Sequence, residues 1–188
     1  MKRDYIEFLM ILGWMVVSTS AAATQRDVEI RDSYSNFDYA YRVALPQGLV
    51  GFRDPAPAPN HGFGVTLKEG AYLWVDASYN SPLWDSLDAA ADARLESRWE
   101  EGFGGVKQIE RNPTRLGSLK AVRLVLGYVD KTGTAMAEEL ILAMRAPKVK
   151  GEVKIIYTIG VRVPESHRDA VEGVLQQFVR GFQLQPLP

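Results

Sequence analysis

The sequence predicts an α+β fold in which a mainly antiparallel sheet carries one mid-chain helix and one C-terminal helix packed on it. Three observations support this fold class. Several segments alternate apolar and polar residues, which is the pattern of half-buried strands. Short turn signals separate most consecutive strands, which favours antiparallel hairpins over a doubly wound parallel sheet. Two segments space apolar residues by three and four positions, as amphipathic helices do.

The first three strands are predicted before the mid-chain helix. Residues 38–45 form the first, because every second residue there is aromatic or aliphatic. A proline-rich loop follows at 46–62, since proline cannot donate to a strand ladder. The second and third strands are predicted at 63–68 and 71–79.

The mid-chain helix is predicted to begin at Ser81, a good cap that is followed by proline, and to end near Phe103. Its expected buried stripe is Trp84, Leu87, Ala91, Leu95 and Trp99. Carboxylates recur every fourth residue on its flank, at Asp88, Asp92, Glu96 and Glu100. This row is either a solvated face or a dock for a basic partner or a weakly bound cation.

The second half of the chain adds four strands and the last helix. The strands are predicted at 106–111, 119–129, 134–146 and 152–163. The C-terminal helix is predicted to open at the capping pattern Ser166 to Asp169. Its expected buried stripe is Val171, Val174, Leu175, Phe178 and Phe182.

Residues 1–23 are predicted to be a cleavable export signal. Lys2 and Arg3 are followed by an apolar run at 8–17 and by three alanines at 21–23, which satisfy the A-x-A cleavage rule. As a helix the run would reach about 15 Å, against a hydrocarbon core of roughly 30 Å, so no stable membrane span is expected after cleavage. Residues 24–188 are predicted to form a single exported domain, periplasmic or secreted.

Composition excludes several classes of function. The chain has 22 Lys and Arg against 23 Asp and Glu, so no general attraction to nucleic acid is expected. It has no cysteine, which excludes disulfides, thiol nucleophiles and a cysteine-linked lipid anchor. Its two histidines, His61 and His167, are too few and too far apart for an ordinary metal site. Accordingly, no metal, cofactor or catalytic residue is assigned.

Three residues are the candidates for a binding surface: Arg53, His61 and Trp74. Arg53 and His61 lie in the proline-rich loop, and the glycines after His61 leave room for a ligand near the backbone. Trp74 belongs to a strand whose two faces are both apolar or aromatic. One of those faces is therefore expected to meet another layer, a partner or an apolar ligand.

The adjacent carboxylates Glu138 and Glu139 lie in a predicted strand. Their side chains are therefore expected to point to opposite faces of the sheet, where they cannot form an acid–base pair with each other.

The element order and two short patterns resemble the PsbP-like superfamily. The patterns are YRVALPQGL at 41–49 and VEGVLQQFVRGFQL at 171–184, whereas the usual Gly-Phe pair before the first strand is replaced by Asn36-Phe37. The superfamily includes extrinsic photosystem subunits, Ran-binding Mog proteins and bacterial exported domains, so its members differ in function. The resemblance implies the fold, and it carries over no catalytic residue.

The sequence thus favours a non-catalytic exported binding or accessory domain, whose partner is a protein or a small apolar ligand. Two alternatives stay open. The domain is a carrier that holds an apolar ligand between sheet and helices, or it is a hydrolase with a dispersed triad that uses His61.

Overall fold

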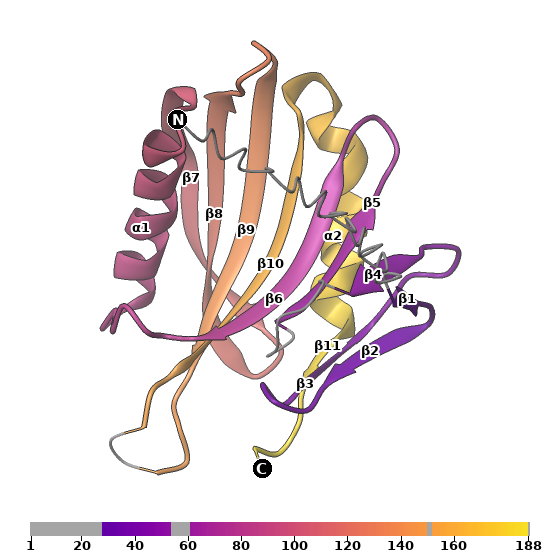
Figure 1. Cartoon of the computed structure of the whole chain (residues 1–188), viewed down its shortest axis with the longest axis vertical. Helices are drawn as coiled ribbons and strands as arrows, with labels where there is room; N and C mark the ends of the chain where they lie inside the picture. Colours follow the sequence, from indigo (N-terminus) through magenta and orange to yellow (C-terminus); the bar gives the residue numbers. More distant parts are fainter. Residues whose placement is uncertain (1–27, 54–60, 150–151, 188) are drawn as a thin grey trace, which may run out of the picture.

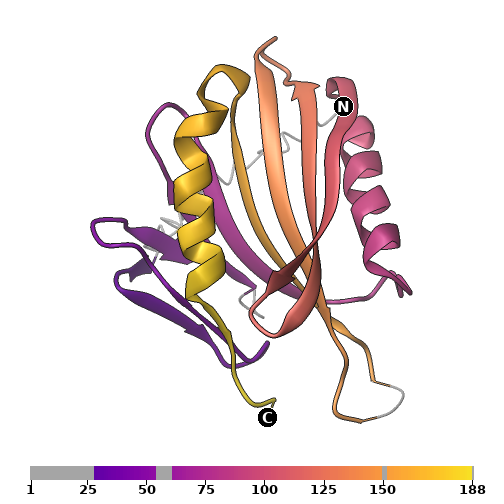
Figure 2. The ribbon, with the colours of Figure 1, turned by 180° about the vertical axis from the view of Figure 1, so that it is seen from behind.

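The computed structural model describes residues 28–53, 61–149 and 152–187. They form an antiparallel eight-stranded sheet in the order β1-β4-β5-β6-β10-β9-β8-β7, a three-stranded sheet in the order β11-β3-β2, and two α-helices, all in the described part of the chain. The helices lie on opposite sides of the large sheet, with α1 in front in Figure 1 and α2 in front in Figure 2. The predicted α+β class is confirmed.

The elements follow one another along the chain in this order. The strands before the first helix are β1 (Glu29–Ile30), β2 (Ser33–Asn36), β3 (Tyr41–Ala44), β4 (Gly51–Arg53), β5 (Gly62–Thr66) and β6 (Tyr72–Tyr79). After α1 (Leu87–Glu100) come β7 (Gly104–Leu116), β8 (Leu119–Val129), β9 (Ala135–Arg145) and β10 (Ile155–Pro164). The chain ends with the short 3-10 helix η1 (Glu165–His167), then α2 (Arg168–Gly181) and β11 (Phe182–Leu184).

Each face of the large sheet has its own apolar core, because the central strands are apolar on both sides. On the α2 face, alternate residues of β6 and β10 pack with the buried stripe of α2 and with the small sheet; this core includes Leu73, Tyr157, Leu175 and Phe178. On the α1 face, a smaller core joins Ala91 of α1 to leucines of β8 and β9. The second face of the sheet thus meets another layer over part of its width.

Helix α1 begins five residues later than predicted. The Asn80 side chain accepts a hydrogen bond from the Trp84 N–H and donates one to the Trp84 carbonyl, while Leu83 takes a left-handed φ of 58°. The chain between Asn80 and Trp84 therefore forms a tight turn, and the helix does not begin there. Ser86 then caps the helix by accepting from the Ala89 N–H at 3.1 Å.

The predicted buried stripes need three corrections. Trp84 lies before the start of α1, in the turn that Asn80 holds. Trp99 is 55% exposed, because α1 presents its buried side through Ala90 and Ala91. Phe182 is buried as predicted, but it lies in β11, where it pairs with Val43 of β3. The helix therefore ends before this residue, and the small sheet supplies its packing.

Four short strands were not predicted. One of them, β4, lies within the predicted loop 46–62; the others are β1, β2 and β11. Strands of two to four residues carry too little alternation to be recognised, and their pairing depends on distant segments. The predicted signal at 1–23 and residues 54–60 of the proline loop lie outside the described residues.

The expectation for Glu138 and Glu139 is confirmed. Glu138 accepts hydrogen bonds from Arg98 of α1, on one face of the sheet. Glu139 accepts from Arg123 of β8, which together with Glu110 of β7 belongs to the other face.

The carboxylate row of α1 has an internal partner over its first half. Arg111 of β7 lies 2.6 Å from Asp92 and 3.7 Å from Asp88. These two carboxylates therefore help to fasten α1 to the sheet, and the row is not simply a solvated face.

Candidate functional site

An aromatic surface lies on the α1 face of the large sheet, beside the helix. Helix α1 packs against β7, β8 and β9, so that β10, β6 and β5 extend to one side of it (Figure 1). We call the α1-side surface of β5, β6 and β10 the open face. Tyr72 and Trp74 of β6 both belong to it, with ring centroids 6.2 Å apart and planes inclined by 20°. Two nearly parallel rings thus form its floor.

Glycines in the neighbouring strands make room for these rings. In the ladder, Trp74 pairs with Gly64 of β5 on one side and with Gly160 of β10 on the other. A Cβ atom at Gly160 would stand 2.3 Å from Trp74 Cζ2, and one at Gly64 would stand 1.9 Å from the Tyr72 hydroxyl oxygen. Each ring therefore lies across the backbone of a neighbouring glycine, a position that any larger residue would block.

Arginines from two elements stand around this floor. The two rings and the arginines line a hollow of about 170 Å³. Its lining residues are Tyr72, Trp74, Arg94, Arg98, Glu138, Leu140, Thr158 and Arg162. The Arg162 guanidinium carbon lies 5.2 Å from the centroid of the Tyr72 ring, within cation–π range. Arg94 of α1 reaches across to Thr158 of β10, with 3.4 Å between Nη2 and Oγ1.

One wall of the hollow is a buried ion pair. The Glu138 side chain is fully buried, and its two oxygens accept hydrogen bonds of 2.7 Å from Nε and Nη2 of Arg98. Burial opposes the charged form of Arg98, but the Glu138 carboxylate more than offsets this and raises the pKa of Arg98 above its usual value. Burial, reinforced by Glu138, also raises the pKa of Tyr128 to about 12. In this wall the charge of the Glu138 carboxylate is compensated by the Arg98 guanidinium.

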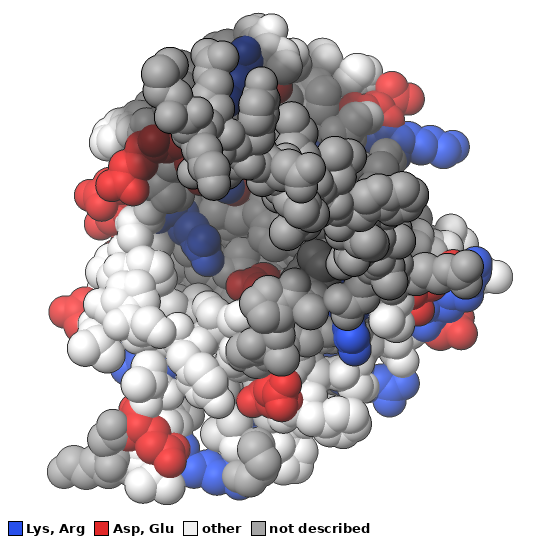
Figure 3. Space-filling model, viewed as in Figure 1, with Lys and Arg blue, Asp and Glu red and all other residues white. Residues whose placement is uncertain are grey.

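The hollow as a whole is positively charged. Its lining includes three arginines and one glutamate, and Arg98 neutralises that glutamate. Among the described residues, no carboxylate lies within 4.0 Å of the Arg94 or Arg162 guanidinium. In Figure 3, basic and acidic side chains are visible in the coloured part of this face, and further acidic side chains lie along the outer side of α1.

The structure does not bring the three predicted site residues together. Trp74 is part of the open face. The His61 carbonyl accepts a hydrogen bond from the Ala77 N–H of β6, and the His61 ring lies on the other side of the sheet. There Nδ1 is 2.8 Å from the Ala77 carbonyl oxygen, and the ring stacks on Tyr39 with the ring centroids 5.4 Å apart. Arg53 is exposed at the end of β4, where its N–H donates to the Val28 carbonyl.

His61 has a clear structural role. Its Nδ1 donates to a backbone carbonyl, and its own carbonyl accepts a 2.9 Å hydrogen bond from the Tyr41 hydroxyl. These bonds join the start of β5 to the small sheet. The neighbouring Tyr39 is buried, and this burial, followed by the influence of Tyr79, raises the pKa of Tyr39 to about 12.

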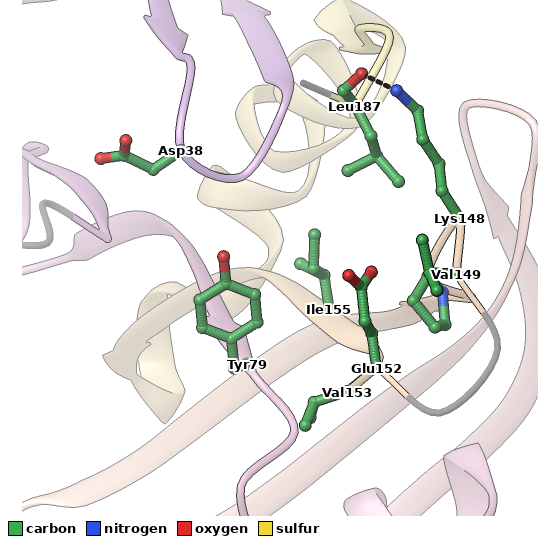
Figure 4. Close-up of a pocket in the computed structure, with 9 residues that line it drawn as sticks. Asp38, Tyr79, Lys148, Val149, Glu152, Val153, Ile155 and Leu187 are labelled. Carbon is green, nitrogen blue, oxygen red and sulfur yellow. Dashed lines mark hydrogen bonds between the residues drawn. The ribbon is translucent and has the colours of Figure 1, made fainter.

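A second, more apolar hollow lies where the β9–β10 connection meets the C-terminal segment (Figure 4). It encloses about 630 Å³ and is lined by Asp38, Tyr79, Pro147, Lys148, Val149, Glu152, Val153, Ile155 and Leu187. Tyr79 is 52% exposed and Val149 58% exposed, so both offer apolar surface to solvent beside the hollow. The Lys148 ammonium donates to the Leu187 carbonyl and holds the C-terminal segment against the connection.

The arginines of the open face were not among the predicted site residues, although a signal for two of them exists in the sequence. Arg94 and Arg98 are four residues apart and therefore share one side of a helix. Arg162 alternates with Gly160 and Thr158 along β10, but the sequence does not reveal that Tyr72 lies beside it.

The described residues contain neither a group of side chains fit to hold a metal ion nor a helix fit to span a membrane. No group of three or more His, Asp or Glu side chains in them is arranged to hold a metal ion. No helix in the same ranges is long and apolar enough to cross a membrane.

Comparison with known proteins identifies the fold. No family model and no curated protein sequence matches the chain. Among solved structures, cyanobacterial PsbP (CyanoP) from Synechocystis aligns over 88% of this chain and 97% of its own, with 12% identity and a TM-score of 0.54. The Ran-binding protein Mog1p of Saccharomyces cerevisiae aligns over 84% of this chain and 96% of its own, with 13% identity and a TM-score of 0.51. The chain therefore has the PsbP-like fold that these proteins share.

Proposed function

We propose that the chain is an exported, non-catalytic binding or accessory domain that works in the periplasm or outside the cell, and that it recognises its partner through the open face around Trp74. One observation carries this proposal. The open face sets two nearly parallel aromatic rings on glycine backbones and places beside them two arginines, Arg94 and Arg162, without a carboxylate partner among the described residues. Aromatic rings and arginines are the side chains most often responsible for binding energy at protein surfaces.

The chemistry of the open face favours binding over catalysis. Aromatic rings stack, and guanidinium groups donate hydrogen bonds, but guanidinium groups keep their proton at neutral pH. The histidines lie elsewhere. His61 belongs to the opposite side of the sheet, and His167 lies at the start of α2, 3.7 Å from Glu69. A hydrolase that uses His61 is the less favoured function, because within the described ranges no serine hydroxyl and no carboxylate makes a hydrogen bond or an ion pair with the His61 ring.

Two further considerations support the location and the type of partner. The export pattern at 1–23 directs the domain out of the cytoplasm. Yeast Mog1p is described as a Ran-binding protein, so the same fold serves protein recognition in that case. A protein partner, bound outside the cytoplasm, is consistent with both.

Replacement of Trp74 by alanine tests the proposal. The Trp74→Ala variant should lose at least tenfold in partner capture from the exported-protein fraction of its host, quantified against the wild type, because it removes half of the aromatic floor. Trp99→Ala is the matched control, since Trp99 is an exposed tryptophan of α1 that does not line the hollow. Circular dichroism checks that both variants are folded. Normal capture by Trp74→Ala would place the binding surface elsewhere.

A second candidate function is the binding of a small apolar ligand, and the hollow in Figure 4 favours it. At about 630 Å³ this hollow is within the size range of small-molecule sites, and Tyr79, Val153 and Ile155 give it an apolar lining. It differs in place from the predicted carrier site, because it lies at the β9–β10 connection and not between the sheet and a helix.

Binding of the neutral dye Nile red tests this second candidate. A charge at Val153, in Val153→Glu, should reduce the dye fluorescence by more than half, because the carboxylate would be desolvated against the apolar lining. Val129→Glu is the control, since Val153 is 38% exposed and Val129, at the end of β8, is 39% exposed. Equal fluorescence of the two variants would exclude the hollow as the site.

A further inference from the structure

Most of the half-buried arginines in and beside the large sheet have a carboxylate partner, and Arg145 of β9 donates instead to the Ala40 carbonyl. Arg98, Arg111, Arg123 and Arg168 each lie within 4.0 Å of a carboxylate. Arg94 is buried to a similar extent, but its one hydrogen bond to a described side chain is the 3.4 Å contact with Thr158. A guanidinium that is partly removed from water without a counter-charge is costly, and an anion that binds beside it removes this cost.

Arg162 provides a second positive group on the same surface. Its guanidinium lies over the Tyr72 ring, and the ring face attracts the cation but does not neutralise it. The two arginines therefore form a positive region in a chain whose overall formal charge is −1. Because the rest of the protein does not supply a general positive field, this region is a local feature of the open face.

The strand register orders the groups along the open face. On β10, Thr158, Gly160 and Arg162 alternate on one side, and they pair with Asp76, Trp74 and Tyr72 of β6. At roughly 3.3 Å per residue, Thr158 and Arg162 are about 13 Å apart, so Arg94 and Arg162 approach from opposite ends. Between them lies Gly160 with the Trp74 indole across it. Arg94, the Trp74 ring and Arg162 therefore follow one another along this face, and Asp76 of β6 lies on the same face opposite Thr158.

We infer that the open face binds a small organic carboxylate that carries one ring, with the ring stacked on Trp74 and the carboxylate held by Arg94 or Arg162. The hollow of about 170 Å³ is small, which suits a single ring with its acid group. The guanidinium fork matches the two oxygens of a carboxylate, and stacking on indole requires a flat ring or a flat sugar face. This inference rests on the proposed use of the open face as a binding surface, and it names the chemistry recognised there.

The test compares three probes that separate the ring from the charge. Benzoate has both, benzamide has the ring without the charge, and acetate has the charge without the ring. Dissociation constants are measured by isothermal titration calorimetry or by quenching of tryptophan fluorescence at low ionic strength. Benzoate should bind at least tenfold more tightly than benzamide or acetate. Glucuronate and glucose repeat the comparison for a sugar ring.

Variants locate the binding. Both Arg94→Gln and Arg162→Gln are measured. The variant that removes the arginine holding the carboxylate should raise the benzoate dissociation constant at least tenfold. Arg42→Gln is the matched control, because it removes the same charge from an exposed residue of the small sheet. Equal affinity for benzoate and benzamide, or equal weakening by Arg42→Gln and by the two open-face variants, would overturn the inference.

The same experiments distinguish this inference from the proposed function. If Trp74→Ala abolishes partner capture while no carboxylate probe binds to the wild type, the open face is the binding surface and the inferred ligand chemistry is wrong. If benzoate binds as expected while Trp74→Ala captures its partner normally, the anion site exists and the partner binds elsewhere.

Discussion

Replacing Arg98 with methionine should lower the free energy of unfolding by about 3–5 kcal/mol, as expected when one member of a buried ion pair is removed. The Glu138 side chain has no exposure to solvent, and both of its oxygens accept hydrogen bonds from Arg98. Methionine keeps much of the volume of arginine but leaves the carboxylate buried without a counter-charge. Urea unfolding followed by circular dichroism measures the difference.

Two further variants show whether the buried pair is the cause. Glu101→Gln removes the exposed carboxylate that also pairs with Arg98, at 2.6 Å, and should cost less than about 1 kcal/mol. The double variant with Arg98→Met and Glu138→Leu should recover a large part of the lost stability, because no unpaired charge stays buried. A double variant no more stable than Arg98→Met would show that lost packing, and not the unpaired carboxylate, accounts for the effect.

Replacing Phe178 with alanine should cost about 3–5 kcal/mol, because it leaves a cavity under α2. Phe178 is fully buried, and its ring centroid lies 6.3 Å from that of Phe63 on β5. For a domain of this size the thermal midpoint should fall by about 10 °C or more. Differential scanning calorimetry measures the shift. Gln177→Ala, at the exposed neighbouring position, should change the midpoint by no more than a degree or two, and a similar shift in both variants would indicate a general loss of helix stability.

The alternation of apolar residues is sufficient to predict the long strands and the class of the fold. It predicts β6 and also indicates that both faces of β6 are covered or used, which is why Trp74 is a candidate binding residue on sequence grounds. It does not show that glycines lie under the two rings, because Gly64 and Gly160 come from distant segments and meet Trp74 through the strand register alone.

The start of α1 shows how a strong local signal can be overruled. Ser81 followed by proline is a favourable beginning for a helix, but the side chain of Asn80 binds both backbone groups of Trp84 and stabilises a turn. Asn80 is buried, so this competition is decided by tertiary packing. Likewise, the carboxylates Asp88 and Asp92 are visible as a row in the sequence, but their partner Arg111 lies on a strand that follows the helix.

The opposed ion pairs of β9 have a consequence for how the sheet finds its correct alignment during folding. From Leu140 to Ala143 every residue of this strand is buried and apolar, so a slip by one position would exchange one apolar face for another at little cost. Glu138 and Glu139 remove that ambiguity. A slip by one position places leucine or alanine opposite either Arg98 or Arg123, which then loses its carboxylate partner. The central strand thus uses charge, and not its hydrophobic pattern, to distinguish the native register from its nearest competitors.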